Sequence, residues 1–454
     1  MPIESVNPAT GEVLERFEPT SPAALDGALA CAERAFEDWR RRPVGERCAR
    51  LTAAARLLRE HKGAHARTMA LEMGKPVLQG EEEVEKCAWA CEFYAEHAPA
   101  MLAAEPHPTE ATRSYVRFDP LGPVLAIMPW NFPFWQVMRF AAPALAAGNT
   151  AVLKHASNVP RAALALAALF RDAGCPEGVF TTVLVGPEVV PTLIADRRIR
   201  GVTLTGSEHA GSRVAEMAGR HLKKTVLELG GSDPFIVLAD ADVDGAARTA
   251  ASARLVNSGQ SCIAAKRFLV VAAVAERFTD ALVDEMRRRR VGEPLARETE
   301  VGPQARADLR DVLHRQVEAS VTRGGTVLLG GRVPAGRGAF YLPTVLSAVA
   351  PGMPAFDEET FGPVAAVVRV PDEAEAIRAA NASAFGLGAS LWTSDLDRAE
   401  RLAAEIEAGL VFVNAQVRSD PRLPFGGVKH SGYGRELSTY GLREFTNVKT
   451  VWVR

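Results

Sequence analysis

Two short glycine-containing segments carry side chains that could do chemistry together. They are Gly259-Gln260-Ser261-Cys262 and Glu228-Leu229-Gly230-Gly231. The glutamate lies 34 residues before the cysteine. A cysteine on a turn of small residues suits a thiol nucleophile, and a carboxylate on a second glycine-rich turn suits a general base. A thiolate attacks carbonyl carbon, and the carboxylate can then activate water against the thioester that results. Taken alone, Cys262 could equally be a small buried hydrophobic residue.

The elements that must position these residues are predicted from apolar periodicity. From about residue 121, short apolar runs alternate with helical stretches. We expect buried strands and intervening helices, the strands at 124–128, 151–153, 181–185, 201–204, 225–227 and 235–238, the helices at 141–147, 161–173, 189–195 and 211–221. Such alternation predicts a parallel sheet with helices on its faces, which binds ligands at the carboxyl ends of its strands. Asn131, Lys154 and Gly206 each follow a predicted strand directly.

The regions on either side of this series complete the expected organisation. Residues 22–100 are rich in Ala, Leu, Glu and Arg, which predicts amphipathic helices, and the run Glu81-Glu82-Glu83 is interpreted as a solvated helix face. A second series of strands and helices runs from about 235 to 430 and contains Cys262, which places the active site between two α/β domains. The segments 113–118 and 446–453 are predicted to be exposed strands.

Seven segments in one order make the chain resemble the aldehyde dehydrogenase superfamily from end to end. They are Pro129-Trp130-Asn131-Phe132-Pro133, Lys154-His155-Ala156-Ser157, Thr205-Gly206-Ser207, Glu228-Leu229-Gly230-Gly231, Gly259-Gln260-Ser261-Cys262, Glu358-Glu359-Thr360-Phe361-Gly362-Pro363 and Pro424-Phe425-Gly426-Gly427. The chain looks most like the bacterial succinate-semialdehyde dehydrogenases, particularly short forms that begin almost directly at the segment Asn7 to Glu12.

The resemblance implies an α/β aldehyde dehydrogenase fold in three parts. These would be a Rossmann-like cofactor-binding domain (residues 1–100 and 121–230), an α/β catalytic domain (231–432) and a small β oligomerisation arm (101–120 and 433–454). In the family the two strands of that arm form a protruding sheet that pairs subunits. We therefore expect a homodimer or a homotetramer.

The resemblance also implies catalytic roles for three residues. Cys262 would attack the aldehyde to give a thiohemiacetal, whose oxyanion would accept from the Asn131 amide and the Cys262 backbone N–H. Glu228 would activate water against the thioester, and burial at a strand end would raise its pKa toward the range of a useful base. For Asn131 an Asx turn is the structural alternative, and for Glu228 an ion pair with a basic residue.

The expected cofactor is NADP⁺, with NAD⁺ accepted as a second choice. The residues expected at its site are Trp130, Lys154, Ser157, Gly206, Ser207, Leu229, Glu359 and Phe361. The Gly206-Ser207 turn would place phosphates at a helix N-terminus. NAD-preferring relatives often carry Glu three residues after the lysine, where this chain has Ser157, so both side chains could contact a 2′-phosphate. Alternatively, Ser157 only caps the helix near Pro160 and the enzyme uses both cofactors equally.

The expected substrate is an aldehyde with a remote carboxylate, foremost succinate semialdehyde. Arg139 lies eight residues after Asn131 and one helical turn from Trp135, and Ser419 matches a polar contact from the opposite loop. Many succinate-semialdehyde enzymes have a second arginine six residues before the nucleophile, where this chain has Val256. An internal ion pair of Arg139 is the structural alternative, and glutarate semialdehyde or an uncharged aliphatic aldehyde are the alternative substrates.

Composition and charge bear on the expected location, partners and metal content of the protein. The chain has 454 residues, a formal charge of −2, and neither a basic-then-apolar leader nor an apolar run of bilayer length, so we expect a cytoplasmic protein without nucleic-acid or membrane partners. Six cysteines in so long a chain do not suggest disulfides, and Cys87 and Cys91 have no histidine at metal-site spacing, so no metal is expected. A nitrilase-type cysteine hydrolase and a non-catalytic relative are the functional alternatives.

Overall fold

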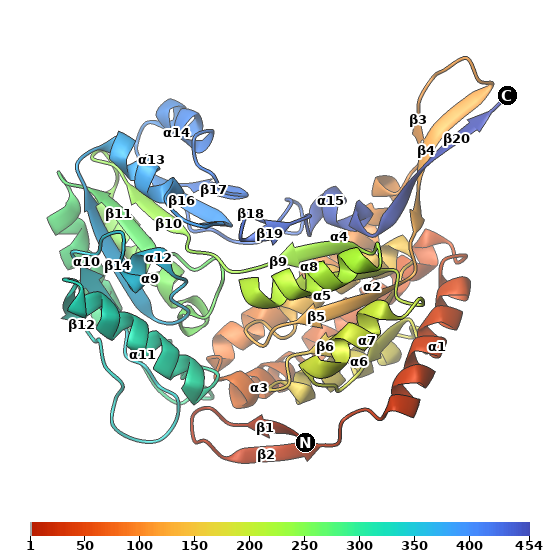
Figure 1. Ribbon diagram of the computed structural model, residues 1–454, viewed down its shortest axis with the longest axis horizontal. Helices are drawn as coiled ribbons and strands as arrows, with labels where there is room; N and C mark the ends of the chain where they lie inside the picture. Colours follow the sequence, from red (N-terminus) through yellow and green to blue (C-terminus); the bar gives the residue numbers. More distant parts are fainter. Residues whose placement is uncertain (1) are drawn as a thin grey trace.

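The computed structural model describes residues 2–454, which form two mainly parallel sheets and a projecting arm (Figure 1). The first sheet has the strand order β19-β9-β8-β5-β6-β7. Its members are β5 (Pro123–Met128), β6 (Thr150–His155), β7 (Phe180–Thr182), β8 (Gly201–Thr205), β9 (Lys224–Glu228) and β19 (Gly432–Tyr433). All pairs are parallel except β19 on β9, where Gly432 lies opposite Glu228.

Helices cover both faces of the first sheet, which explains why its strands are continuous apolar runs. Along β5, Val124 and Ala126 face one core while Leu125 faces the other. The crossovers are α5 (Trp135–Ala147), α6 (Pro160–Asp172), a short 3₁₀ turn η1 (Pro187–Val189) with α7 (Val190–Ala195), and α8 (Glu208–Arg220). Every residue of α5 is buried.

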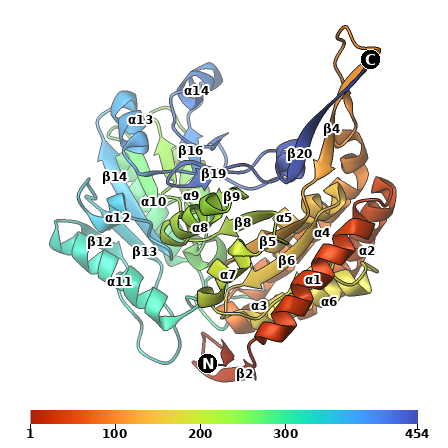
Figure 2. The ribbon, with the colours of Figure 1, turned by 45° about the vertical axis from the view of Figure 1, so that its right-hand side comes forward.

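The N-terminal segment forms a hairpin and four helices, of which α1 packs on the first sheet and the others on its covering helices α5 and α6 (Figure 2). α2 lies against α4, α4 and α2 lie against α5, and α1 lies against β6. Their bounds are β1 (Ile3–Val6), β2 (Val13–Phe17), α1 (Pro22–Trp39), α2 (Val44–Glu60), α3 (Lys62–Met73) and α4 (Val77–Met101). No helix of the described part has the length and apolarity needed to span a bilayer.

The second sheet has the order β12-β13-β14-β11-β10-β16-β17, with only β12 antiparallel. Its strands are β10 (Pro234–Val237), β11 (Arg267–Val271), β12 (Thr326–Leu329), β13 (Thr344–Ser347), β14 (Val364–Val370), β16 (Gly388–Trp392) and β17 (Leu410–Val413). Its helices are α9 (Val243–Leu255), α10 (Ala275–Arg287), α11 (Ala307–Thr322), α12 (Pro354–Asp357), α13 (Glu373–Asn381) and α14 (Leu396–Ala403). Alternate β10 side chains, Phe235 and Ile236, enter different cores, so this sheet is also covered on both faces.

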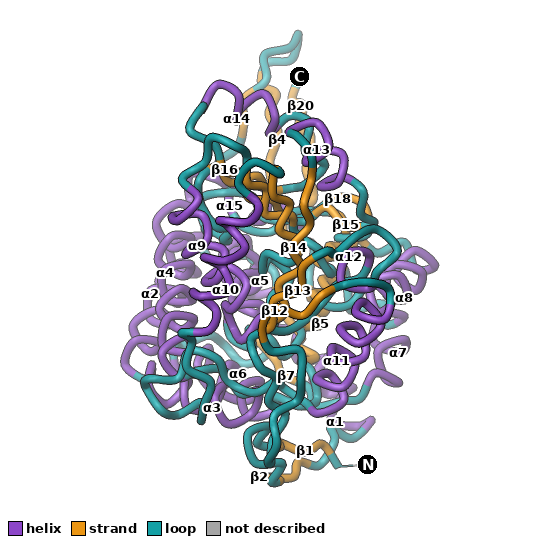
Figure 3. Tube along the Cα trace, turned by 90° about the vertical axis from the view of Figure 1, so that its left-hand side faces the viewer, coloured by secondary structure: helices purple, strands orange, loops and turns teal. Residues whose placement is uncertain are grey.

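After β17 the chain leaves the second sheet and returns to the first. It passes through β18 (Val428–Lys429), which pairs with β15 (Phe385–Gly386), then β19 and α15 (Ser438–Glu444), which packs on α5. It ends in β20 (Thr446–Val453), which pairs along its full length with β4 (Arg113–Pro120), beside β3 (Glu105–Pro106). This sheet projects from the body with the C-terminus at its tip, opposite the N-terminal hairpin (Figures 1 and 3).

The predicted elements correspond to observed ones, with three differences in their bounds or placement. The helix predicted at 141–147 is α5, which begins six residues earlier, at Trp135. The strand predicted at 181–185 is β7, which ends at Thr182. The segment assigned to the arm, 433–454, divides in two, because only β20 lies in the projecting sheet while β19 and α15 pack on the first sheet. The strands predicted at 113–118 and 446–453 are confirmed as β4 and β20.

Candidate active site

The segment before Cys262 has an unusual backbone. Helix α9 ends at Leu255 and continues into the 3₁₀ turn η2 (Val256–Gly259), in which Asn257, Ser258 and Gly259 have φ of 51°, 56° and 79°. Two consecutive non-glycine residues in the left-handed region cost roughly 1–2 kcal/mol each, so other contacts must hold them. The third position requires glycine, because a Cβ there would lie 2.2 Å from the Gly362 backbone.

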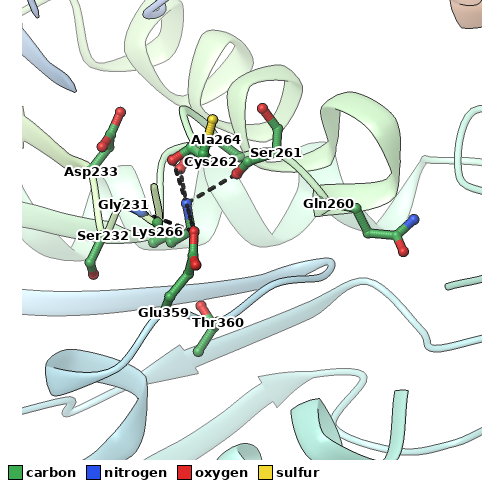
Figure 4. A network of polar contacts seen from close by, with 12 residues as sticks. Gly231, Ser232, Asp233, Gln260, Ser261, Cys262, Ala264, Lys266, Glu359 and Thr360 are labelled. Atoms are coloured by element: carbon green, nitrogen blue, oxygen red, sulfur yellow. Dashed lines mark hydrogen bonds and ion pairs between the residues drawn. The ribbon is translucent and has the colours of Figure 1, made fainter. Parts of the chain in front are cut away.

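Two buried cations hold this turn through its carbonyl groups. Arg254 donates to the carbonyl oxygens of Gly259 at 2.6 Å, Ala265 at 2.9 Å and Thr360 at 3.2 Å. Lys266 Nζ donates to the carbonyl oxygens of Ser261, Cys262 and Ala264 at 2.8–3.1 Å and lies 3.6 Å from the Glu359 carboxylate (Figure 4). The guanidinium of Arg254 thus hydrogen-bonds to backbone carbonyl groups around the loop, and Arg254 does not line the cavity.

The cysteine itself opens into a cavity of about 530 Å³. Burial raises the pKa of the Cys262 thiol to about 12, and the nearby charges of Arg139 and Lys266 act in the opposite direction. In Figure 4 the sulfur points away from the Lys266 amino group, which holds the backbone rather than the thiol. The thiol is therefore protonated near neutral pH in this structure, and attack requires that its proton be removed.

Asn131 lies on the other side of the same loop. Its Nδ2 donates to the Gln260 carbonyl at 3.1 Å, and its own carbonyl accepts from Asn257 Nδ2 at 2.7 Å. The Asn131 Oδ1 atom has no hydrogen-bond partner within residues 2–454, so the Asx turn considered as an alternative is not formed. The contacts fix the amide next to the nucleophile loop and leave it one N–H to donate.

Glu228 is buried at the end of β9 and does not line the cavity that contains Cys262. A Cβ added at Gly426 would lie 2.7 Å from Glu228 Oε1, so the carboxyl group lies against the Pro424–Gly427 turn. Neither carboxyl oxygen has a hydrogen-bond partner in the described part of the chain, and burial raises the pKa well above its usual value of 4.5. The charge of Glu436 raises it further, while Arg139 and Arg435 lower it. Because the carboxyl group lies outside the cavity lining, we expect the side chain to turn toward Cys262 before it acts on a thioester there.

Arg139 makes the internal ion pair that was the structural alternative. Its Nε lies against Glu436 Oε2, its Nη2 donates to Thr205 Oγ1 at 3.3 Å, and its guanidinium lies 4.4 Å from the centroid of the Phe425 ring. The side chain also lines the cavity. Its Nη1 makes no hydrogen bond to any group within residues 2–454, so one edge of the guanidinium stays available to a ligand.

Trp135 and Ser419, both predicted at the substrate site, are in contact. Trp135 Nε1 donates to Ser419 Oγ at 3.1 Å, and both residues line the cavity with Cys262 and Arg139. Ser419 also accepts from Lys86 Nζ at 2.7 Å. No motif or spacing pointed to Lys86, which is one lysine in an acidic helix.

The interpretation of Glu81–Glu83 as a solvated face is wrong for Glu83. This residue is 4% exposed and forms an ion pair with the buried Lys75. Its Oε1 accepts the backbone N–H groups of Phe134 and Trp135, each at 2.9 Å, at the start of α5. A carboxylate is favourable there because a helix N-terminus presents unpaired N–H groups.

Most of the residues predicted for a dinucleotide lie at or just after the carboxyl ends of strands in the first sheet, whereas Glu359 and Phe361 lie before β14 of the second sheet. Lys154 is 8% exposed, yet it has no carboxylate within 4.0 Å among residues 2–454. Ser157 is exposed and does not cap α6, whose N-cap is Val159 with no side-chain bond. An unpaired, mostly buried ammonium suits an anionic ligand such as a phosphate.

The remaining cofactor candidates form one group at the start of α8 and a second group around Glu359 and Phe361. Ser207 caps α8 by accepting from Ala210 N at 3.3 Å, Gly206 precedes it, and Leu229 packs so closely on Gly211 that a Cβ there would lie 2.5 Å away. Glu359 Oε1 accepts from Gly231 N at 3.0 Å. Trp130 and Phe361 pack edge to face, with ring centroids 5.7 Å apart.

Cys87 and Cys91, the pair considered for a metal, are both buried in α4. Burial raises the pKa of both thiols, which favours the protonated form over the metal-binding thiolate. Within residues 2–454 no group of three or more His, Cys, Asp or Glu side chains could hold a metal ion.

Comparison with known proteins agrees with this fold. The model of the aldehyde dehydrogenase family matches residues 1–451. The succinate-semialdehyde dehydrogenase [NADP(+)] of Mycobacterium avium is 49% identical over 100% of this chain and 97% of its own length. The succinate-semialdehyde dehydrogenase [NADP(+)] 1 of Mycobacterium tuberculosis is 48% identical over 100% of both chains.

A solved structure agrees equally well. The crystal structure of succinic semialdehyde dehydrogenase from Streptococcus pyogenes in complex with NADP⁺ superposes with a TM-score of 0.97, at 38% identity over 99% of both chains. The family model over residues 1–451 and these full-length matches show that the chain belongs to the aldehyde dehydrogenase family.

Proposed function

We propose that this protein oxidises succinate semialdehyde to succinate, with NADP⁺ as the preferred electron acceptor. The observation that carries the proposal is the cavity that joins the Cys262 thiol to Trp135, Arg139 and Ser419. It combines a nucleophile for the aldehyde with a guanidinium and a hydroxyl for a remote carboxylate. The names of the full-length relatives support the same substrate and cofactor.

Cys262, Asn131 and Glu228 act in successive steps of the oxidation. The Cys262 thiol gives its proton to water, and the thiolate then forms a C–S bond to the aldehyde carbon while the carbonyl π electrons move to oxygen. The resulting oxyanion accepts from Asn131 Nδ2 and the Cys262 backbone N–H. When bound, the nicotinamide cofactor supplies the acceptor for the hydrogen and electron pair that leave this carbon. Glu228 then rotates toward Cys262, takes a proton from water and so directs hydroxide at the thioester. Its raised pKa suits this step, because a carboxylate with a raised pKa is a stronger base.

The cofactor residues are proposed from the fit of the chain to an anionic dinucleotide. Lys154 and Ser157 would contact the 2′-phosphate, and Gly206 and Ser207 at the start of α8 would hold the pyrophosphate. The other proposed contacts are Trp130, Leu229, Glu359 and Phe361. NAD⁺ binds the same site more weakly, because Lys154 and Ser157 then have no 2′-phosphate to contact.

One assay tests both parts of the proposal. Reduced cofactor is followed at 340 nm with succinate semialdehyde, glutarate semialdehyde and butanal, each with NADP⁺ and NAD⁺. We expect the highest kcat/KM for succinate semialdehyde with NADP⁺. A higher value for butanal would make the substrate an uncharged aldehyde, and a tenfold preference for NAD⁺ would refute the cofactor assignment.

We also propose that the protein is a cytoplasmic homo-oligomer paired through the projecting sheet. Val448, Trp452 and Val453 on β20 are 64%, 46% and 37% exposed, which is unfavourable on a projecting sheet in water and favourable in an interface. Light scattering after size-exclusion chromatography measures the mass directly. A monomer at micromolar concentration would contradict this assignment.

A further inference from the structure

Four cationic side chains line the cavity that contains Cys262, namely Lys86, Arg139, Arg289 and Arg418. Two of them already have a carboxylate, since Arg139 is paired with Glu436 and Arg289 with Glu300 at 2.8 Å. Arg418 is exposed. Lys86 differs from all three, because it is partly buried and has no carboxylate within 4.0 Å among residues 2–454.

Lys86 is held in a fixed position by two neighbours. Its Nζ donates to Ser419 Oγ at 2.7 Å and lies 4.5 Å from the centroid of the Trp135 ring. Trp135 Nε1 donates to the same Ser419 oxygen at 3.1 Å. With both lone pairs of this hydroxyl occupied, its own hydrogen is left to donate, and the ammonium keeps two further N–H groups.

We propose that Lys86, together with the Ser419 hydroxyl, binds the carboxylate of the aldehyde substrate. The inference rests on the proposed function and names the residue that selects an anionic substrate at this site. A carboxylate has two oxygens, and a fixed ammonium with an adjacent free O–H offers a donor to each. Arg139 can assist only with the edge of its guanidinium that Glu436 does not occupy.

The charges around Lys86 explain why an anion is favourable there. Glu83 and Cys87 face it from α4, Arg139 from α5, and Asp420 from the loop that carries Ser419. Both carboxylates in this group form ion pairs with other residues, Glu83 with Lys75 and Asp420 with Arg422. Burial, reinforced by Arg139, lowers the pKa of Lys86 to about 8. A substrate carboxylate would favour the ammonium form.

The test compares two variants that each remove one positive charge from the cavity lining. Lys86→Met should lower the ratio of kcat/KM for succinate semialdehyde to that for butanal about ten- to hundredfold, mainly through KM, as expected for a charged hydrogen bond. Arg418→Met should change this ratio less than about threefold, and Lys86→Arg should recover most of the loss. A loss in Lys86→Met no larger than that in Arg418→Met would overturn the proposal.

A second measurement needs no variant. In the wild-type protein the same ratio should fall as the pH rises above about 8, because Lys86 then loses its proton while other titrations affect both aldehydes alike. A ratio constant from pH 7 to 9.5 would overturn the role of Lys86. A wild-type protein that prefers butanal at every pH would overturn the proposed substrate as well, so the two failures are distinguishable.

Discussion

Replacing Arg139 by methionine tests the ion pair buried beneath the cavity. Methionine retains much of the apolar volume of the side chain but leaves Glu436 and Glu228 without the cation between them. Removing one partner of a buried pair typically costs about 3–5 kcal/mol. The free energy of unfolding should therefore fall, in addition to any effect on the substrate.

The magnitude can be worked out from the pKa of Glu436. Burial raises this pKa above 4.5, and Arg139 lowers it, so without Arg139 the carboxyl takes up a proton on folding. A group that is neutral in the folded state and ionised when unfolded costs about 1.4 kcal/mol for each pH unit above its unfolded pKa. Measured from 4.5, the cost of a neutral Glu436 is at most about 4 kcal/mol at pH 7.5 and about 1.4 kcal/mol at pH 5.5. Because the pKa of Glu436 is already raised in the wild type, these values are upper limits for the difference between the variant and the wild type.

The sign follows from the direction of the shift. Since the folded state binds the extra proton, the stability of the Arg139→Met variant relative to the wild type falls as the pH rises. With an unfolding entropy of roughly 2 cal/mol/K per residue, 454 residues unfolding as one unit give a decrease in Tm of at most about 4 °C at pH 7.5 and at most about 1–2 °C at pH 5.5.

Differential scanning calorimetry at the two pH values measures this difference, with the double variant Arg139→Met/Glu436→Gln as the control. The double variant has no carboxyl group at position 436, so its Tm difference from the wild type should lose most of its pH dependence. A Tm difference that is equal at both pH values in the single variant would refute the reasoning. The double variant is also the better background in which to measure the effect of Arg139 on the KM for succinate semialdehyde.

Three further outcomes are expected. Cys262→Ser should abolish oxidation while a fluorescence titration still shows NADPH binding, and steady turnover by this variant would contradict the mechanism. Glu228→Gln should give, in stopped flow, a burst of reduced cofactor equal to the number of active sites and then little turnover. Ser157→Glu should shift the ratio of kcat/KM values toward NAD⁺ at least about tenfold, because a carboxylate repels the 2′-phosphate; an unchanged ratio would remove Ser157 from the site.

The sheets were predictable because their strands are buried on both faces. A run such as Val124–Met128 is continuously apolar, so neither register nor pairing needs to be known to recognise it. The placement of Asn131, Lys154 and Gly206 followed from the rule that ligands bind where such strands end. Trp135 and Ser419, 284 residues apart in the chain, were brought together only by the family resemblance, and the structure places them in contact.

The partners of the charged residues were not predictable, because they depend on contacts between distant segments. Nothing in the run Glu81–Glu83 distinguishes the exposed members from Glu83, whose partners are Lys75 and the N-terminus of α5. Arg139 and Glu436 are 297 residues apart, and either alone is compatible with a solvated surface. The left-handed backbone at Asn257 and Ser258 likewise requires the contacts that hold it.

The return of the chain from the second sheet to the first has a consequence for synthesis on the ribosome. β9 ends at Glu228, but its outer neighbour β19 begins only at Gly432. The separation in sequence between β4 and its partner β20 is longer still. At about 5–20 residues per second, β9 is complete about 10–40 s before β19 emerges. During that time both strands present open edges to other nascent chains. We therefore expect C-terminal truncations before residue 432 to aggregate rather than to accumulate as inactive monomers.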